Sequence, residues 1–78
     1  MGEIIFDSMI DVKGLECPRP LLKMKQTLEN MQSGQVLKVI ASDPQTKLTF
    51  PPYLLRSGDT ILAVEDHGAE IRYYINKK

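Results

Sequence analysis

The chain has 78 residues, 42% of them hydrophobic, and its 10 Lys and Arg side chains are balanced by 10 Asp and Glu side chains. This length has room for a single domain, residues 1–78, and excludes a mechanism that needs several domains or a large internal active-site cavity. The formal charge of zero removes the electrostatic attraction on which autonomous nucleic-acid binders depend, so we expect no direct nucleic-acid partner.

The first half of the chain predicts a strand, a helix and a second strand. Residues 9–12 have a strand pattern that stops at Gly14. Residues 36–41 are apolar at nearly every position, which is typical of a strand in the centre of a sheet. Between residues 18 and 32, apolar side chains recur at helical spacing and predict a helix with one buried face, formed by Leu21, Met24, Leu28 and Met31.

The second helix is predicted to be interrupted. The Asp43-Pro44 pair is a typical helix start, because Asp accepts hydrogen bonds from early amides and Pro gives up a donor that the first turn does not use. The Pro51-Pro52 pair removes two donors and disfavours helical geometry at the preceding residue. We therefore expect a short turn at residues 44–48 and another near residues 52–57.

The last third of the chain predicts an antiparallel hairpin, with strands at residues 60–65 and 70–76 and a turn at residues 66–68. Apolar and polar residues alternate in the final strand, so one face should be buried and the other, with Arg72 and Tyr74, should meet solvent.

Together these elements predict an α+β fold: a two-layer α/β sandwich in the order β-α-β-α-β-β, with two helices on one face of the sheet. The first crossover should be right-handed and make the first two strands parallel. The last two strands should be antiparallel because their connection is short.

Cysteine usage and apolar runs indicate the compartment. Cys17 is the only cysteine, so the chain can form neither an intramolecular disulfide nor a C-x-x-C dithiol or zinc motif. The early apolar run Ile4-Ile5-Phe6 is far shorter than the roughly 20 residues that span a bilayer. We expect a cytoplasmic protein with no membrane partner.

The segment from Gly14 to Pro20 is where spacing predicts chemistry. We expect Cys17 at the helix N-cap, Pro18 at the first helical position and Pro20 at the third, where a missing N–H costs nothing. The free amide of Arg19 and the positive helix end should then face the sulfur and lower the pKa of the thiol modestly. The Arg19 guanidinium should add to this shift, and the neighbouring Glu16 should oppose it.

Other chemistries of Cys17 find no support in the sequence. A buried, inert cysteine would belong within the apolar helix face rather than between a turn glycine and two prolines. The only histidine, His67, lies in a predicted hairpin turn and is not expected to serve as a base for acyl transfer. No Cys/His/acid cluster suggests a metal site. The remaining hypothesis is that Cys17 is an activated thiol that accepts a sulfur atom as a persulfide and passes it to a partner protein.

A specific combination of motifs extends over about residues 8–77: Gly14-Leu15-x-Cys17-Pro18-x-Pro20, Met31-Gln32-x-Gly34, Asp43-Pro44 with Pro51, and a final strand that ends Tyr73-Tyr74-Ile75. In these motifs the chain resembles the TusA/SirA-like family of small sulfur-carrier proteins. The resemblance implies a mixed four-stranded sheet, similar to the carboxy-terminal domain of a bacterial translation initiation factor.

The resemblance also implies the chemistry. Cys17 would receive a persulfide from a cysteine desulfurase or rhodanese-like donor and deliver it to a downstream relay protein. The chain would need no cofactor beyond this covalent persulfide, and would act as a monomeric carrier in a relay rather than as a stand-alone enzyme. Thiolation of tRNA wobble uridine, molybdenum-cofactor maturation, oxidation of inorganic sulfur compounds and selenium transfer all stay open as pathways.

Charged residues near the motif are candidates for partner docking. Arg19, Lys23 and Lys25 could form a face for an acidic partner, or simply a solvated helix face. Asp43 and Arg56 are equally open to both readings. The chain also departs from the family at Thr49-Phe50-Pro51-Pro52, where many members have Asp-Ile-Pro, so docking around the second helix could differ.

A second hypothesis comes from a different class of protein. The exposed sheet face, with Lys38, Arg72 and Tyr74, could make the chain a non-catalytic adaptor or regulatory module that binds a protein or an RNA.

Overall fold

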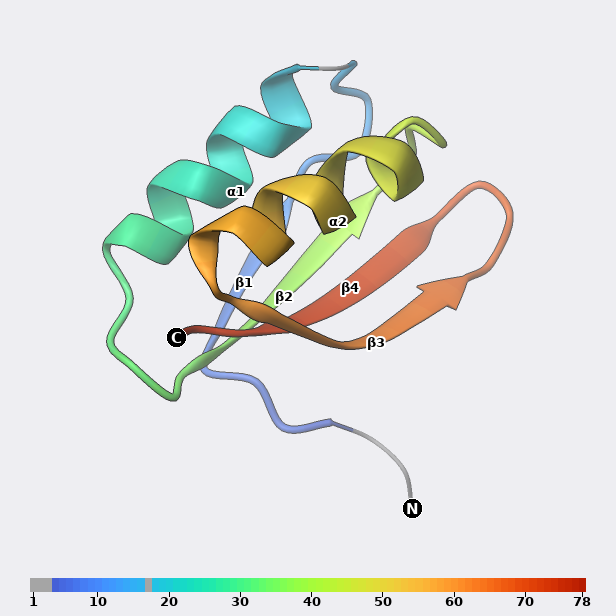
Figure 1. Cartoon of the computed structure of the whole chain (residues 1–78). Coiled ribbons are helices and arrows are strands. Elements are labelled where there is room, and N and C mark those ends of the chain that lie inside the picture. The colour runs from blue at the N-terminus through green and yellow to red at the C-terminus, as the bar shows by residue number, and fades with distance from the viewer. Residues whose placement is uncertain (1–3, 17) are drawn as a thin grey trace.

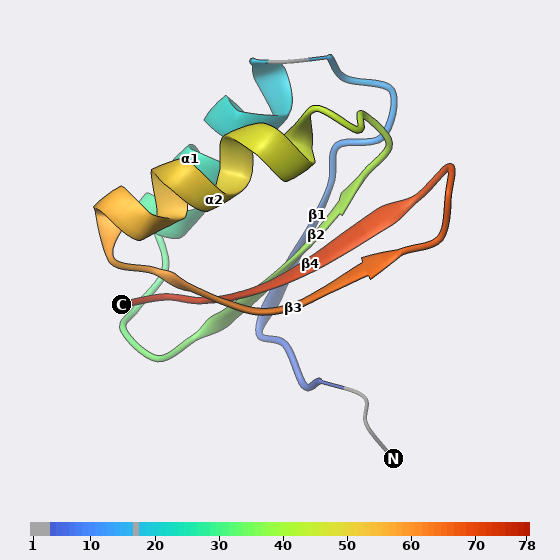
Figure 2. The same cartoon turned by 45° about the vertical axis from the view of Figure 1, so that its right-hand side comes forward.

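The computed structural model describes residues 4–16 and 18–78, and it arranges them as a mixed four-stranded sheet with two helices on one face (Figures 1 and 2). The strand order is β1-β2-β4-β3, with β1 and β2 parallel and the other neighbours antiparallel. The predicted element order, the sheet type and the helix layer are therefore confirmed. The elements are β1 (Ser8–Asp11), α1 (Arg19–Glu29), β2 (Val36–Ala41), α2 (Thr46–Ser57), β3 (Thr60–Asp66) and β4 (Ile71–Asn76).

The two central strands supply the buried face of the sheet. In β2 and β4 every second side chain is fully or almost fully buried, because these positions face the helices and not solvent. The register pairs these residues directly across the two strands, which lets them pack as one surface. The pairs are Leu37 with Ile75, Val39 with Tyr73, and Ala41 with Ile71.

The other sheet face differs from the prediction at Tyr74. Its side chain is only 6% exposed, whereas the alternating pattern predicts a solvent-facing position. Lys38 Nζ lies 5.6 Å from the centroid of the Tyr74 ring and 5.1 Å from that of Phe6. The prediction was wrong here because strand periodicity assigns a face but does not show what covers it.

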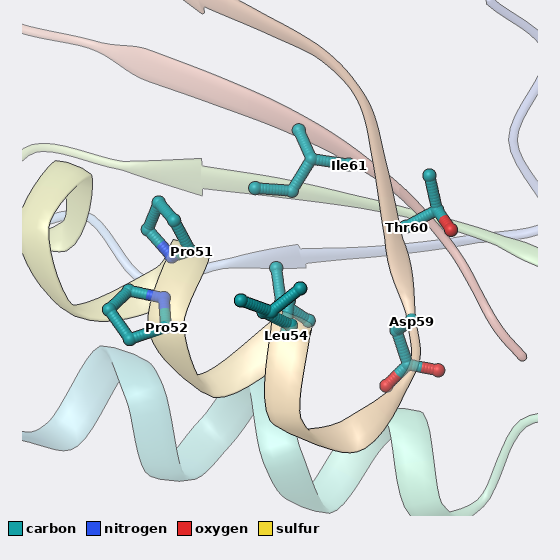
Figure 3. Close-up of a pocket in the computed structure, with 7 residues that line it drawn as sticks. Pro51, Pro52, Leu54, Asp59, Thr60 and Ile61 are labelled. Atoms are coloured by element: carbon teal, nitrogen blue, oxygen red, sulfur yellow. The ribbon is translucent and has the colours of Figure 1, made fainter.

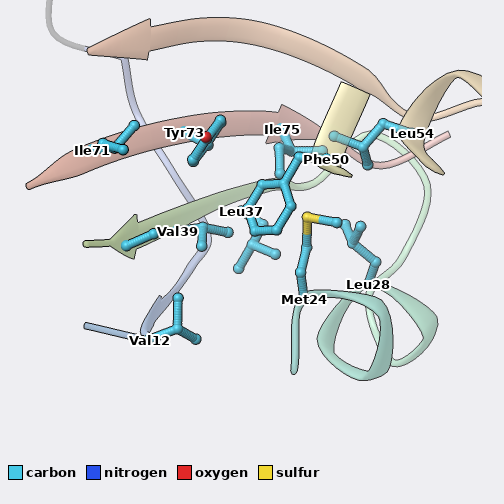
Figure 4. Close-up of a cluster of buried hydrophobic side chains, with 11 residues drawn as sticks. Val12, Met24, Leu28, Leu37, Val39, Phe50, Leu54, Ile71, Tyr73 and Ile75 are labelled. Carbon is cyan, nitrogen blue, oxygen red and sulfur yellow. The ribbon is translucent and has the colours of Figure 1, made fainter. Parts of the chain in front are cut away.

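Helix α1 packs by the predicted apolar stripe. Pro20, Met24 and Leu28 are buried at intervals of four residues, and Figure 4 shows Met24 and Leu28 reaching from α1 toward Phe50 and the sheet. The helix ends at Glu29, earlier than the predicted residue 32. Residue 31 still contacts the core from the turn that follows, so the periodic pattern runs past the helix itself.

Helix α2 is continuous, so the predicted break at the two prolines was wrong. Pro51 and Pro52 both lie on the exposed side of α2. The buried side of the same helix carries Thr46, Phe50 and Leu54. An interior proline costs about 3 kcal/mol, and burying a Phe or Leu side chain contributes about 1.5–3 kcal/mol each. Burial of Phe50 and Leu54 therefore offsets much of the cost and holds the segment helical.

A buried hydrogen bond joins the start of α2 to the sheet. Thr46 Oγ1 donates to the Asp43 carbonyl at 2.8 Å and lies 2.7 Å from the Tyr73 hydroxyl. Because the single hydroxyl proton of Thr46 is already used, Tyr73 must be the donor in this pair. Burial raises the pKa of Tyr73, which keeps its phenol protonated for this role.

Neither helix, within residues 4–16 and 18–78, is long and apolar enough to cross a membrane.

Truncation of the core should separate buried from exposed positions on α1. We expect Met24→Ala to lower the free energy of unfolding by about 2–5 kcal/mol, because Met24 is fully buried and its removal leaves a cavity. Leu22→Ala is the matched control, since Leu22 is 50% exposed on the same helix. Urea unfolding measures both, and equal losses in the two variants would contradict the core assigned to α1.

Candidate functional site

The candidate site lies at the edge of the sheet where the parallel strands β1 and β2 both end. Gly14 follows β1 and Ser42 follows β2, and the Gly14 amide donates to the Ser42 hydroxyl oxygen at 2.9 Å. Parallel neighbours bring their carboxyl ends to the same edge, which is where open α/β sheets tend to hold their sites. The two loops therefore meet beside the amino end of α1 (Figure 1).

Backbone hydrogen bonds fix the loop that leads from β1 to α1. Val12 continues the strand by donating to the Ile40 carbonyl at 2.8 Å, and Leu15 turns back to donate to the Val12 carbonyl at 3.2 Å. Gly14 occupies this turn with φ +84°, a left-handed conformation that favours glycine. Leu15 packs partly against the core, so the loop is fixed up to the residue before Glu16.

The start of α1 differs from the prediction by one residue. Pro18 is the N-cap, because its carbonyl accepts the first helical bond from Leu22 at 3.0 Å while its own ψ of 12° is not helical. Pro20 is then the second helical residue rather than the third, a position where its missing N–H still costs nothing. The prediction that Cys17 is the N-cap concerns a residue outside those described.

The Arg19 amide is not free, as the sequence had suggested. It donates to the Glu16 carbonyl at 2.9 Å. The prediction was wrong because it counted unpaired helical amides without the turn that precedes the helix. What remains of the predicted field is the positive end of the α1 dipole and the guanidinium of Arg19.

Two polar cavities lie at the amino end of α1. The first, of about 330 Å³, is lined by Gly14, Glu16, Pro18 and Arg19, so it lies against residues on both sides of position 17. The second, of about 290 Å³, is lined by residues of both loops: Gly14, Leu15, Glu16, Ser42, Asp43 and Pro44. Both are smaller and more polar than the mainly apolar pockets that typically enclose small-molecule ligands.

The structure brings together some of the predicted docking residues. Arg19 and Lys23 are exposed, lie four residues apart and share one face of α1. Lys25 lies about 200° around the helix from Lys23 and so belongs to the opposite flank. The ion pairs found among the described residues include neither Arg19 nor Lys23. These two cations are therefore available to an acidic partner.

Asp43 and Arg56 lie at opposite ends of α2. Asp43 lines the second cavity, and its carboxylate accepts the Gln45 amide at 2.9 Å. Arg56 lies in the last turn of α2, about 15 Å along the helix from Thr46. Of this pair, the structure brings only Asp43 to the candidate site.

A solvated ion pair also joins the loop to the β3–β4 hairpin. Lys13 Nζ lies 3.7 Å from a Glu70 carboxylate oxygen, and Arg72 donates to the other oxygen of that carboxylate. The hydrogen bond from Arg72 holds the pKa of Glu70 below its ordinary value, and Lys13 adds to this effect. His67 lies in the hairpin turn, half exposed, with Nε2 3.6 Å from a Glu65 carboxylate oxygen.

A larger cavity lies elsewhere on the molecule. It has a volume of about 630 Å³ and a mainly apolar lining from the second half of α2 and the start of β3 (Figure 3). None of its lining residues contributes to the two cavities beside position 17. Within the described part of the chain, no group of three or more His, Cys, Asp or Glu side chains could hold a metal ion.

Sequence reasoning missed Ser42 as a site residue. The available signal was a polar residue directly after an apolar strand and directly before Asp43-Pro44. Its meaning depends on the parallel pairing of β1 and β2, which brings it to Gly14 across 28 positions of sequence.

Comparison with known proteins identifies the family. Residues 8–77 match the family described as Sulfurtransferase TusA. The chain is 39% identical over 72 residues to the sulfur carrier protein TusA of Allochromatium vinosum, covering 92% of this chain and 95% of the relative. It is 33% identical over 78 residues to the sulfur carrier protein TusA of Pseudomonas entomophila, covering 100% of this chain and 98% of that relative.

A solved structure supports the same fold. The SirA-like protein from Desulfitobacterium hafniense superposes with a TM-score of 0.78 at 21% identity, covering 90% of this chain and 96% of that chain. The fold is thus shared where the sequence has diverged. Because the family match spans almost all of the described elements and the relatives align along nearly their whole length, the chain belongs to the TusA family of sulfurtransferases.

Proposed function

We propose that this chain is a sulfur carrier that accepts a sulfane sulfur as a persulfide on Cys17 and passes it to an acceptor protein. The observation that carries the proposal is the match to a sulfurtransferase family over residues 8–77, a range that includes the only cysteine of the chain. The geometry supports it, because the flanking Glu16 and Pro18 are both exposed at the amino end of α1. A partner's sulfur can approach such a position.

The transfer balances without an oxidant or reductant. The Cys17 thiolate attacks the outer sulfur of a donor persulfide, a new S–S bond forms to Cys17, and the donor's own S–S bond breaks to release a thiolate. In the second step an acceptor thiolate attacks the outer sulfur of the Cys17 persulfide and releases the Cys17 thiolate. Each step exchanges one S–S bond for another, so the chain needs a reactive thiolate but no cofactor.

The charges near position 17 should favour the thiolate form of Cys17 over the thiol form, but only moderately. The positive end of α1 and the Arg19 guanidinium stabilise an anion at the start of the helix, and Glu16 opposes them. A modest stabilisation of the thiolate suits a relay, because a strongly stabilised thiolate is a weaker nucleophile and takes sulfur from the donor persulfide more slowly. We therefore expect a moderately lowered pKa for Cys17.

The partners follow from this chemistry. A cysteine desulfurase or rhodanese-like enzyme supplies the persulfide, and a downstream relay protein receives it, so the chain works within a relay and not as a stand-alone enzyme. Arg19 and Lys23 form the docking face nearest the site, with Asp43 beside it, while Lys25 and Arg56 lie farther away. A thiol that must stay free between transfers requires a reducing compartment, and we place the carrier in the cytoplasm.

The RNA-binding form of the adaptor hypothesis loses its stacking residue. Base stacking needs an exposed aromatic ring, but Tyr74, the ring on which this hypothesis relies, is 6% exposed. The Lys38 ammonium also lies over this ring and over Phe6. The sulfur carrier is therefore the function that the site supports best.

A direct test is mass spectrometry after incubation with a cysteine desulfurase and free cysteine. The wild-type chain should gain the mass of one sulfur atom, and the gain should disappear on treatment with a thiol reductant, because a persulfide S–S bond is reducible. Cys17→Ser should gain nothing. No gain on the wild type, or an equal gain on Cys17→Ser, would contradict the proposal.

A second test addresses the docking face. The double variant Arg19→Glu, Lys23→Glu should slow persulfide transfer from the desulfurase by about tenfold at low ionic strength, because rim charges mainly steer association. The difference should shrink as salt is added. Lys25→Glu is the control on the opposite flank of α1 and should change the rate little. An equal loss in Lys25→Glu, or a loss that salt leaves unchanged, would rule out steering by this face.

A further inference from the structure

We infer that Ser42 is a positioning residue for sulfur transfer: its hydroxyl, by accepting the Gly14 amide, fixes the segment that leads into Cys17. This inference rests on the proposed function, since it concerns the geometry of the same thiol. It assigns a role in the transfer to a residue that lies 25 positions after the cysteine and does not itself need to touch the sulfur.

The first step is the fixed relation between the two strands. Parallel pairing sets Asp11 opposite Ile40, and the Val12 amide continues the ladder by donating to the Ile40 carbonyl at 2.8 Å. Beyond these residues both strands end, and the chains diverge into loops. The bond from Gly14 to Ser42, at 2.9 Å, extends the tie between the two chains past the end of the sheet.

The second step is that this tie reaches outside the loop. The other hydrogen bonds between described residues of the segment after Val12 are local. Lys13 donates to the Asp11 carboxylate, Leu15 to the Val12 carbonyl and Arg19 to the Glu16 carbonyl. Such local bonds hold the shape of each turn but do not fix its position relative to the sheet. The Lys13 ion pair with Glu70 is long range, but both side chains are partly solvated and flexible. Leu15 also packs partly against the core, but apolar packing is not directional. Ser42 therefore supplies the directional anchor.

The third step concerns Gly14 itself. Its φ of +84° directs the chain through a left-handed turn, and the same residue donates the bond to Ser42. The residue at position 14 thus sets both where the loop leaves the sheet and which way it proceeds toward position 17. Loss of the anchor would let this turn shift as a unit, although its internal hydrogen bonds could persist.

The fourth step is the demand of the reaction. Attack on a persulfide requires the nucleophilic sulfur to align with an S–S bond held by another protein, and a displacement of about 1 Å can cost on the order of a hundredfold in rate. The Gly14–Ser42 bond is solvent exposed, so water can replace it in the folded protein and the fold itself should survive its loss. Removal of the hydroxyl should thus affect alignment more than stability.

The experiment compares Ser42→Ala with Ser42→Thr, which retains a hydroxyl. Ser33→Ala is the matched control, because the Ser33 hydroxyl also joins distant segments, donating to the Lys78 carbonyl at 2.8 Å. None of these changes alters a charge, and Glu16, Arg19 and Asp43 stay in place around the site. A change in the pH profile of Cys17 alkylation by iodoacetamide therefore reports geometry.

We expect Ser42→Ala to lower the kcat of sulfur acceptance from a cysteine desulfurase about three- to tenfold with little change in KM, and to shift the pH profile of alkylation. Ser42→Thr should restore both, and Ser33→Ala should match the wild type. Urea unfolding should show that all three variants fold.

The inference is overturned if Ser42→Ala behaves as the wild type in transfer and alkylation, if Ser42→Thr fails to restore them, or if Ser33→Ala causes the same loss. Alkylation requires no sulfur donor, so it tests Ser42 even if the wild type takes up no sulfur. Failure of the wild type to form a persulfide would instead defeat the proposed function, which keeps the two outcomes apart.

Discussion

The parallel pairing of β1 with β2 is the constraint on which the candidate site depends. Parallel strands need a crossover, and here α1 provides it by returning the chain to the start of β2. The carboxyl ends of both strands then lie at one edge, together with the amino end of the crossover helix. The loop that precedes α1 and the loop that follows β2 meet there, as the bond between Gly14 and Ser42 shows. An antiparallel arrangement of the same strands would separate these loops.

A dense core under the helices keeps this edge fixed. Met24 from α1, Phe50 from α2 and Tyr73 from β4 are all buried, and the Phe50 and Tyr73 rings lie 4.7 Å apart. The hydrogen bond from Tyr73 to Thr46 ties the first turn of α2, and with it the Asp43 carbonyl, to the central strand. The mobile parts of a small domain are its loops, and both loops of the site are attached to this core at each end.

Sequence patterns correctly predicted the elements whose conformation depends mainly on the residues within the element itself. The bounds of β2 were predicted correctly because its apolar run permits little else. The α2 break was wrong because proline acts locally, whereas the burial of Phe50 and Leu54 depends on a sheet that the segment itself does not encode. Tyr74 was assigned to solvent for the same reason, since Lys38, from a different strand, lies over its ring. The role of Ser42 required a strand register that no local pattern provides.

The open form of the site follows from both the size of the chain and the demands of a relay. A chain of 78 residues has little interior beyond its core, and the cavities beside position 17 are polar and no larger than about 330 Å³. The proposed exchange uses thiolates and so needs no base within the chain, and His67 lies in the hairpin turn with Nε2 3.6 Å from a Glu65 carboxylate oxygen. A carrier must also offer the same sulfur to two different proteins in succession, so a deep pocket would hinder the second transfer. An open site at one edge of the sheet, completed by each partner in turn, would meet both requirements of the proposed relay.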